Sequence, residues 1–192
     1  MNPTDRMPPI SDIEMTAEQR DAVADFQRTR NTLKFHGPFV PLLRSPELLS
    51  KTQRVGEYLR YRSALPPHLS EMAILITAQH WRQRYEWGLH APIAAKVGVS
   101  EGIITAVAQG RRPAGMAANQ AALHDFCVEL LRTQSVSDPT YEATVEHFTE
   151  RGVVDLVGIL GYYSLLAMVM NTTRTALPES MVQALEPFPH WS

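Results

Sequence analysis

The sequence predicts an all-α protein, built as a single-domain bundle of about seven to nine helices. Hydrophobic residues recur at helical spacing over most of the chain, and capping residues, proline or glycine mark where several of these segments begin or end. No segment alternates apolar and polar residues as a half-buried strand does. The chain has 192 residues, of which 44% are hydrophobic and 20% charged, as is usual for one soluble domain.

The first helix is predicted after a flexible arm over residues 1–15, and it opens the helical domain, residues 16–174. Thr16 and Gln19 have the spacing of a capping box, which predicts a helix over 16–31. Ser45 followed by Pro46 is typical of a helix start, and the second helix should run to residue 61.

The next two helices should be the centre of the fold. Residues 68–81 are apolar almost all round, which is typical of a buried helix, and Ser70 is expected to cap it. A further helix is predicted over 85–97, where Gly98 ends it. We expect a break between the two near residues 82–85.

Four more helical segments follow. Ser100 should cap a short helix to residue 109, and an amphipathic helix is predicted over 117–133. The dipeptide Asp138-Pro139 starts a helix that should end at Gly152. A second all-apolar helix is expected over 153–172, followed by an extended tail, residues 175–192, with one turn at 179–185.

Composition excludes several classes of protein. The net charge of −2 gives no field that would attract nucleic acid. The apolar helix near the C-terminus barely reaches the length of a membrane span, and it contains Asp155, so a soluble core helix explains it better. Cys127 is the single cysteine, which excludes an internal disulfide and fits a reducing, cytoplasmic setting.

The segment 71–90 holds the candidate catalytic residues Glu71, Glu86 and His90. Glu86 and His90 are one helical turn apart, so the carboxylate can orient the imidazole as a general acid–base pair. The alternative is an exposed ion pair worth about 0.3–0.5 kcal/mol. Glu71, expected in a first helical turn, would lie about 22 Å from Glu86 along a straight helix. A relay among the three therefore requires the break, or a neighbouring subunit.

Four stretches resemble the carboxymuconolactone decarboxylase and alkylhydroperoxidase-D superfamily. They are Ser70-Glu-Met-Ala-Ile-Leu75, Tyr85-Glu-Trp-Gly-Leu-His90, Gly98-Val-Ser-Glu-Gly-Ile-Ile104 and Arg151-Gly-Val-Val-Asp-Leu-Val-Gly158. The resemblance implies an alkylhydroperoxidase-D-like all-α fold that binds a small-molecule substrate and self-associates as a dimer, trimer or hexamer.

The hydroperoxidase branch of that superfamily has a glutamate, cysteines twelve and fifteen residues later, and a histidine nineteen residues later. Here the glutamate and histidine correspond to Glu71 and His90, but Gln83 and Glu86 stand at the cysteine positions. Thiol-based peroxide reduction is therefore not expected, although the family implies a peroxiredoxin-type label. The chain is more similar to the decarboxylase branch.

The resemblance implies cofactor-free acid–base chemistry on a small carboxylated metabolite: decarboxylation, isomerisation or lactone chemistry. His90 would move a proton, Glu86 would orient it and Glu71 would tune the relay, so His90→Ala should lose activity while the fold survives. The alternative is a non-catalytic, oligomeric scaffold or small-molecule-binding protein. The sequence supports neither a metal site nor a cofactor. The candidate substrate-binding residues are His36, Arg82, Gln83, Tyr85 and Trp87. Each also has a simpler interpretation, as a core aromatic, a structural loop residue or a solvated side chain.

Overall fold

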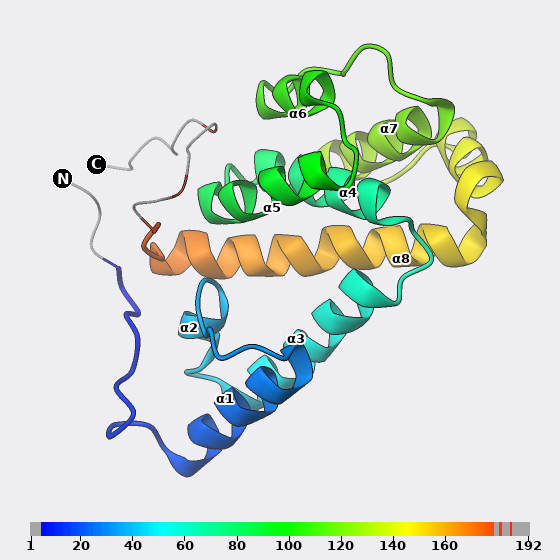
Figure 1. Cartoon of the computed structure of the whole chain (residues 1–192). Coiled ribbons are helices and arrows are strands. Elements are labelled where there is room, and N and C mark those ends of the chain that lie inside the picture. The colour runs from blue at the N-terminus through cyan, green and yellow to red at the C-terminus, as the bar shows by residue number, and fades with distance from the viewer. Residues whose placement is uncertain (1–4, 179–180, 182–184, 186–192) are drawn as a thin grey trace.

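The computed structural model describes residues 5–178, 181 and 185. This part of the chain forms eight helices and no strand, which confirms the all-α prediction (Figure 1). The helices are α1 (Ala17–Arg30), α2 (Phe39–Leu42), α3 (Pro46–Tyr61), α4 (Pro67–His80), α5 (Arg84–Lys96), α6 (Glu101–Ala108), α7 (Ala118–Thr133) and α8 (Asp138–Thr173).

The helix α4 is the centre of the fold, as predicted. Every residue from 69 to 78 is buried, because α5, α6, α7 and α8 all pack against it. The predicted cap is wrong: α4 begins at Pro67, and Ser70 lies buried in its second turn. Proline suits the first helical position, where its missing N–H is not needed, so the helix starts earlier than a serine cap would place it.

The long helix α8 contains the break that was expected between two helices. Thr149 has φ 62° and ψ 169°, which interrupts the helix three residues before the predicted position at Gly152. Gly152 has a packing role just after the break. A Cβ atom at this position would lie 2.6 Å from the Cβ of Phe148, so a larger residue would force the two turns apart.

The apolar part of α8 is long enough to cross a membrane, yet 56% of its most apolar window is buried inside the protein. Asp155 in this part is buried, and its carboxylate accepts hydrogen bonds from the Tyr58 hydroxyl at 3.0 Å and from the Ala64 amide at 2.7 Å. A partnered buried carboxylate is typical of a protein core. The fold thus resembles that of a soluble helical protein.

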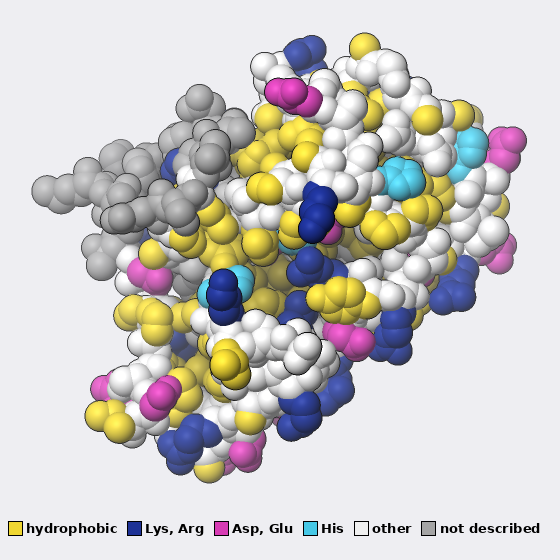
Figure 2. All heavy atoms as spheres, viewed as in Figure 1, with side chains coloured by type: hydrophobic (Ala, Val, Ile, Leu, Met, Phe, Trp, Pro, Cys, Tyr) yellow, Lys and Arg dark blue, Asp and Glu magenta, His cyan; other side chains and the backbone are white. Residues whose placement is uncertain are grey.

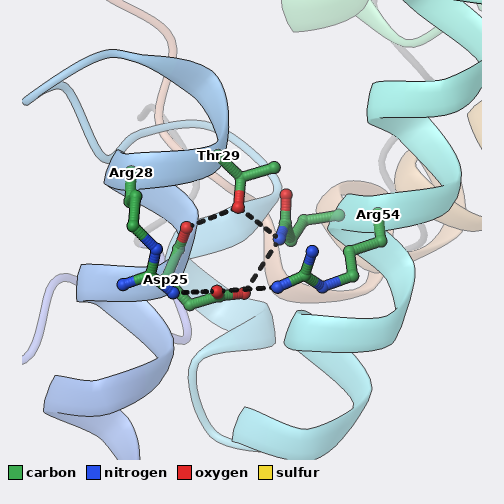
Figure 3. Close-up of polar contacts among 5 residues, drawn as sticks. Asp25, Arg28, Thr29 and Arg54 are labelled. Carbon is green, nitrogen blue, oxygen red and sulfur yellow. Dashed lines mark hydrogen bonds and ion pairs between the residues drawn. The ribbon is translucent and has the colours of Figure 1, made fainter.

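The N-terminal helices α1 and α3 are joined by a polar network around Asp25 (Figure 3). Its carboxylate pairs with Arg28 at 2.5 Å and Arg54 at 2.8 Å, and it accepts a hydrogen bond from the Gln53 amide at 3.1 Å. The backbone carbonyl of Asp25 accepts from the Thr29 hydroxyl. This network fixes the end of α1, which carries one of the arginines of the site described below.

The two ends of the described chain lie together (Figure 1). The Arg6 amide donates to the carbonyl of Thr173 at 2.8 Å, and the Ala176 amide donates to the Asp5 carboxylate at 3.2 Å. Flexibility of the arm stays a prediction, and most of the turn predicted at 179–185 lies outside the described residues. On the face seen in Figure 2, acidic and basic side chains are both spread over the surface, in keeping with the small net charge.

Candidate active site

A three-residue turn, Trp81 to Gln83, folds α5 back against α4 and confirms the break that the site requires. Arg82 adopts φ +47°, a left-handed conformation that ends α4 and reverses the chain. Gln83 caps α5, because its side-chain oxygen accepts a hydrogen bond from the Tyr85 amide at 2.8 Å. Its amide donates to Asn171 on α8 at 2.7 Å, which anchors the turn to the core.

The turn brings Glu71, Glu86 and His90 into contact within one chain. His90 Nδ1 lies 2.7 Å from Glu71 Oε2, and Nε2 lies 3.4 Å from Glu86 Oε2. The exposed fractions are 7% for Glu71, 2% for Glu86 and 1% for His90, so the simpler interpretation as an exposed ion pair does not hold. Glu71 lies in the second turn of α4 rather than the first, which places it opposite His90.

Glu86 has an unusual feature for a buried carboxylate. Its Oε2 lies near His90, but Oε1 has no hydrogen-bond partner. Buried polar atoms without a partner are rare, since each costs free energy that a hydrogen bond would offset. A proton donor on a bound molecule would satisfy this oxygen.

A small cavity of about 30 Å³ adjoins the pair Glu86 and His90. It has room for about one water molecule. Its lining combines aromatic, aliphatic and basic side chains: Arg30, His36, Pro38, Phe39, Arg60, Tyr85, Glu86, Leu89, His90, Tyr162, Tyr163 and Leu166. Acid–base groups and arginines therefore line the same small cavity.

Two arginines supply positive charge to this cavity. Arg30 donates to the Tyr162 hydroxyl at 3.3 Å and to the carbonyl of Gln53 at 3.2 Å, whereas its Nε has no partner. Arg60 is half-buried, and neither guanidinium forms an ion pair with a described residue. Gly56 makes room for this arrangement, because a Cβ atom there would collide with Tyr162.

Burial and neighbouring charges shift the pKa values of His90 and Tyr163. Burial alone would lower the pKa of His90, but the hydrogen bonds and charges of Glu71 and Glu86 outweigh it, so the pKa is raised. Burial, with the charge of Glu86, raises the pKa of Tyr163 well above its usual value. The ring of Tyr163 packs edge-on against His90, with centroids 5.2 Å apart. The site therefore favours the protonated form of the imidazole more than water does, and it favours the neutral form of Tyr163.

The five predicted substrate-binding residues divide into two groups. His36 and Tyr85 line the cavity, and a hydrogen bond joins His36 Nδ1 to the Tyr85 hydroxyl. Trp87 is buried but does not line the cavity, Gln83 caps α5, and Arg82 is exposed in the turn. The structure therefore does not bring these three to the cavity, since each has a structural place in the α4–α5 connection or the core.

Among the polar residues of the cavity, sequence reasoning missed four, Arg30, Arg60, Tyr162 and Tyr163. The signal for the tyrosines was the pair of phenols within an otherwise aliphatic helix. No comparable signal marked the arginines, because they lie on α1 and α3, outside the stretches that carried the resemblance.

The described residues contain no group of three histidine, cysteine, aspartate or glutamate side chains suited to a metal ion. Cys127 is fully buried on α7, and burial raises the pKa of its thiol. A buried neutral thiol is a poor nucleophile, so this residue packs as a small core side chain.

One segment of the sequence matches a known protein family. Residues 46–124 match the sequence profile of the carboxymuconolactone decarboxylase family. No protein of curated function matches the sequence.

Several solved structures share the fold. An uncharacterized peroxidase-related protein with an alkylhydroperoxidase AhpD core, from Ralstonia eutropha JMP134, gives a TM-score of 0.74 at 19% identity, over 93% of this chain and 95% of that chain. One from Silicibacter sp. TM1040 gives 0.70 at 14% identity, over 94% and 96% of the two chains. The debrominase Bmp8 gives 0.66 at 11% identity, over 90% and 92%.

The matched profile covers α3 to α6 and part of α7, which include the whole of the α4–α5 hairpin that carries Glu71, Glu86 and His90. Residues 46–124 are thus similar in sequence to the carboxymuconolactone decarboxylase family, and the chain has an alkylhydroperoxidase-D-like fold.

Proposed function

We propose that this protein catalyses cofactor-free acid–base chemistry on a small carboxylated metabolite, such as decarboxylation, isomerisation or lactone chemistry. The observation that carries the proposal is the buried imidazole of His90, held between two buried carboxylates and open to a cavity with two arginines. A histidine whose pKa is raised toward or above neutrality can give and take a proton at physiological pH.

The proposed roles follow from position. Glu86 and His90 line the cavity, so they would exchange protons with the substrate directly. Glu71 does not line it and acts through His90, whose Nδ1 it contacts at 2.7 Å. Arg30 and Arg60 would bind the substrate carboxylate, because guanidinium groups match a carboxylate in charge and geometry. Substrate binding is thus assigned to arginines of α1 and α3, and not to Arg82, which the sequence placed among the candidate substrate-binding residues.

A thiol-based mechanism is not proposed. Gln83 caps α5 and Glu86 belongs to the acid–base pair, so both positions that carry cysteine in the hydroperoxidase branch serve other purposes here. The debrominase and the peroxidase-related proteins share the fold with this chain at 11–19% identity, which supports no transfer of their activities.

Deuterium exchange tests the proposal at the level of reaction class. The purified protein is incubated in D₂O with β-keto acids and carboxylated γ-lactones, and NMR follows deuterium at the carbon beside the carbonyl together with loss of CO₂. Relative to the rates without protein, we expect faster exchange or decarboxylation of at least one acid, and much less acceleration of exchange in its methyl ester, which lacks the charge that the arginines bind. No reaction with any of the acids, or equal rates for acid and ester, would contradict the proposal.

A second candidate function is a non-catalytic, oligomeric small-molecule-binding or scaffold protein. The cavity volume favours the scaffold, because about 30 Å³ is far below the roughly 300–1,000 Å³ of typical ligand pockets. Under this hypothesis the buried triad would be a structural element that joins α4 to α5. Binding of a carboxylated metabolite without any exchange would support this function over the enzyme.

We also propose that the protein self-associates in the cytoplasm through the exposed face of α8. Val154 is 69% exposed, and Val157 and Met168 are each 45% exposed, one above another along the helix. Exposed apolar stripes of this kind mark interaction surfaces.

The variant Val157→Glu is expected to reduce the assembled species to monomer, because it places a charge in an apolar interface. Light scattering after size-exclusion chromatography measures the mass. Val55→Glu, on the exposed surface of α3 and 50% exposed, is the matched control and should leave the mass unchanged. A native protein that is already monomeric would rule out self-association.

A further inference from the structure

A second cavity, larger than the one beside His90, lies away from the triad. It has a volume of about 340 Å³ and is lined by the end of α4, the loop after α6 and one face of α7. Its lining is Ile76, Gln79, His80, Val107, Gly110, Arg111, Arg112, His124, Asp125, Val128, Glu129, Leu131, Arg132 and Thr133. None of these residues belongs to the small cavity beside His90. The volume is within the range of pockets that bind small organic molecules.

The lining has an apolar part and a basic part. Ile76 and Val107 are 4% exposed, and Val128 and Leu131 are half-buried beside them, so together they form an apolar wall. Three arginines and two histidines contribute the basic part: His80, Arg111, Arg112, His124 and Arg132. A ligand that fits this lining would have an apolar body and polar acceptor atoms.

The acidic side chains of the cavity are already occupied. Asp125 accepts two hydrogen bonds from Arg112, both at 2.9 Å, and its Oδ1 lies 3.0 Å from the His124 ring. Glu129 accepts from the amide and the hydroxyl of Ser137, at 2.8 and 3.3 Å. Both carboxylates therefore accept hydrogen bonds from donors of the protein, and neither needs a cationic group of a ligand as a partner.

The remaining basic groups are available to a ligand. Arg132 is exposed and makes no ion pair with a described residue. Arg111 donates only to the neutral side chain of Gln109, so its charge is not balanced. Gly110 adopts φ +66°, and a Cβ atom there would lie 2.9 Å from Gln79 Nε2, so the loop holds its backbone close to this wall of the cavity.

We propose that this cavity is a second binding site, for a small organic anion with an aromatic or branched apolar body. The apolar wall would bury the body of the ligand, and Arg111 and Arg132 would bind its carboxylate from the open side. The site is separate from the acid–base triad and stands whether or not the proposed chemistry does.

The test uses 2-naphthoate as the probe and the neutral 2-naphthamide as its matched partner of nearly equal shape. Calorimetry on the full-length protein measures affinity, and the ¹H–¹⁵N resonance of Gly110 reports the place of binding. We expect naphthoate to bind at least tenfold more tightly than the amide, since charge-assisted hydrogen bonds exceed neutral ones, and to shift the Gly110 resonance.

Three variants test which charged residues bind naphthoate. The double variant Arg111→Ala/Arg132→Ala should weaken naphthoate binding roughly tenfold or more. Arg54→Ala removes one exposed guanidinium from α3, and Glu86→Gln alters the triad; both should leave naphthoate binding unchanged. Equal affinity for acid and amide, an unaffected double variant, or a Gly110 resonance that does not move would overturn the proposal.

Discussion

The variant His90→Ala is expected to lower the free energy of unfolding by about 3–5 kcal/mol at neutral pH, because it removes the imidazole that lies between two buried carboxylates. Glu71 and Glu86 are 7% and 2% exposed, so bulk water solvates neither carboxylate well. Alanine also leaves a space between α4 and α5. From sequence alone we expected this variant to keep its fold; the burial of His90 leads us to expect substantial destabilisation instead.

The pH dependence identifies the charge as the cause. The pKa of His90 is raised in the folded protein, so between the ordinary value of about 6.5 and the raised value the folded state binds more protons than the unfolded state. The stabilisation is fully present below pH 6.5, and it is lost as the pH rises through the folded pKa. The difference in stability between the native protein and His90→Gln, which cannot titrate, should therefore shrink as the pH increases.

Urea denaturation between pH 5.5 and 9 measures both effects. His147→Ala is the control, because His147 is exposed on α8 and its loss should change stability by less than about 0.5 kcal/mol. If His90→Ala were no less stable than this control, or if the difference from His90→Gln did not vary with pH, the imidazole would not be the charged partner described here.

The central helices could be predicted because local signals and tertiary packing agree on them. The apolar run 69–78 is hydrophobic on every face, and burial on every face is what the structure shows. The cap of the same helix could not be predicted, since Pro67 and Ser70 are both acceptable starts and only the packing of the preceding loop chooses between them. The break in α8 at Thr149 has no local signal, because threonine rarely adopts positive φ.

The candidate site could be predicted in part. Spacing alone placed Glu86 and His90 on one helical face. The contact between Glu71 and His90 depends on the left-handed turn at Arg82, and an arginine gives no sequence signal for such a turn. The two arginines of the cavity could not be predicted, for a different reason. Arg30 and Arg60 are about thirty or more residues before His90 in the chain, and only the packing of α3 against α8 and of α1 against α3 brings them to the cavity.

The variant Glu86→Gln should reduce the rate of exchange or decarboxylation at least 100-fold, which is the lower range for loss of general acid–base catalysis. Glutamine keeps the shape of the side chain, so it removes the charge beside His90 Nε2 without opening a space. It also replaces one of the two carboxylate oxygens by an amide nitrogen, which cannot accept a proton from the substrate. The loss should fall on kcat, because the proposed carboxylate-binding residues Arg30 and Arg60 are unchanged.

Two further variants distinguish proton transfer by Glu86 from the indirect role of Glu71, which acts through His90. Glu71→Gln keeps the residues that line the cavity, so its main effect should be on the pH profile: losing one carboxylate moves the pKa of His90 downward and shifts the profile to lower pH. Glu101→Gln, an exposed glutamate in the first turn of α6, should behave as the native protein in every respect. If Glu86→Gln retained full turnover while Glu71→Gln lost it, proton transfer would run through α4, and the roles assigned here to the two carboxylates would have to be exchanged.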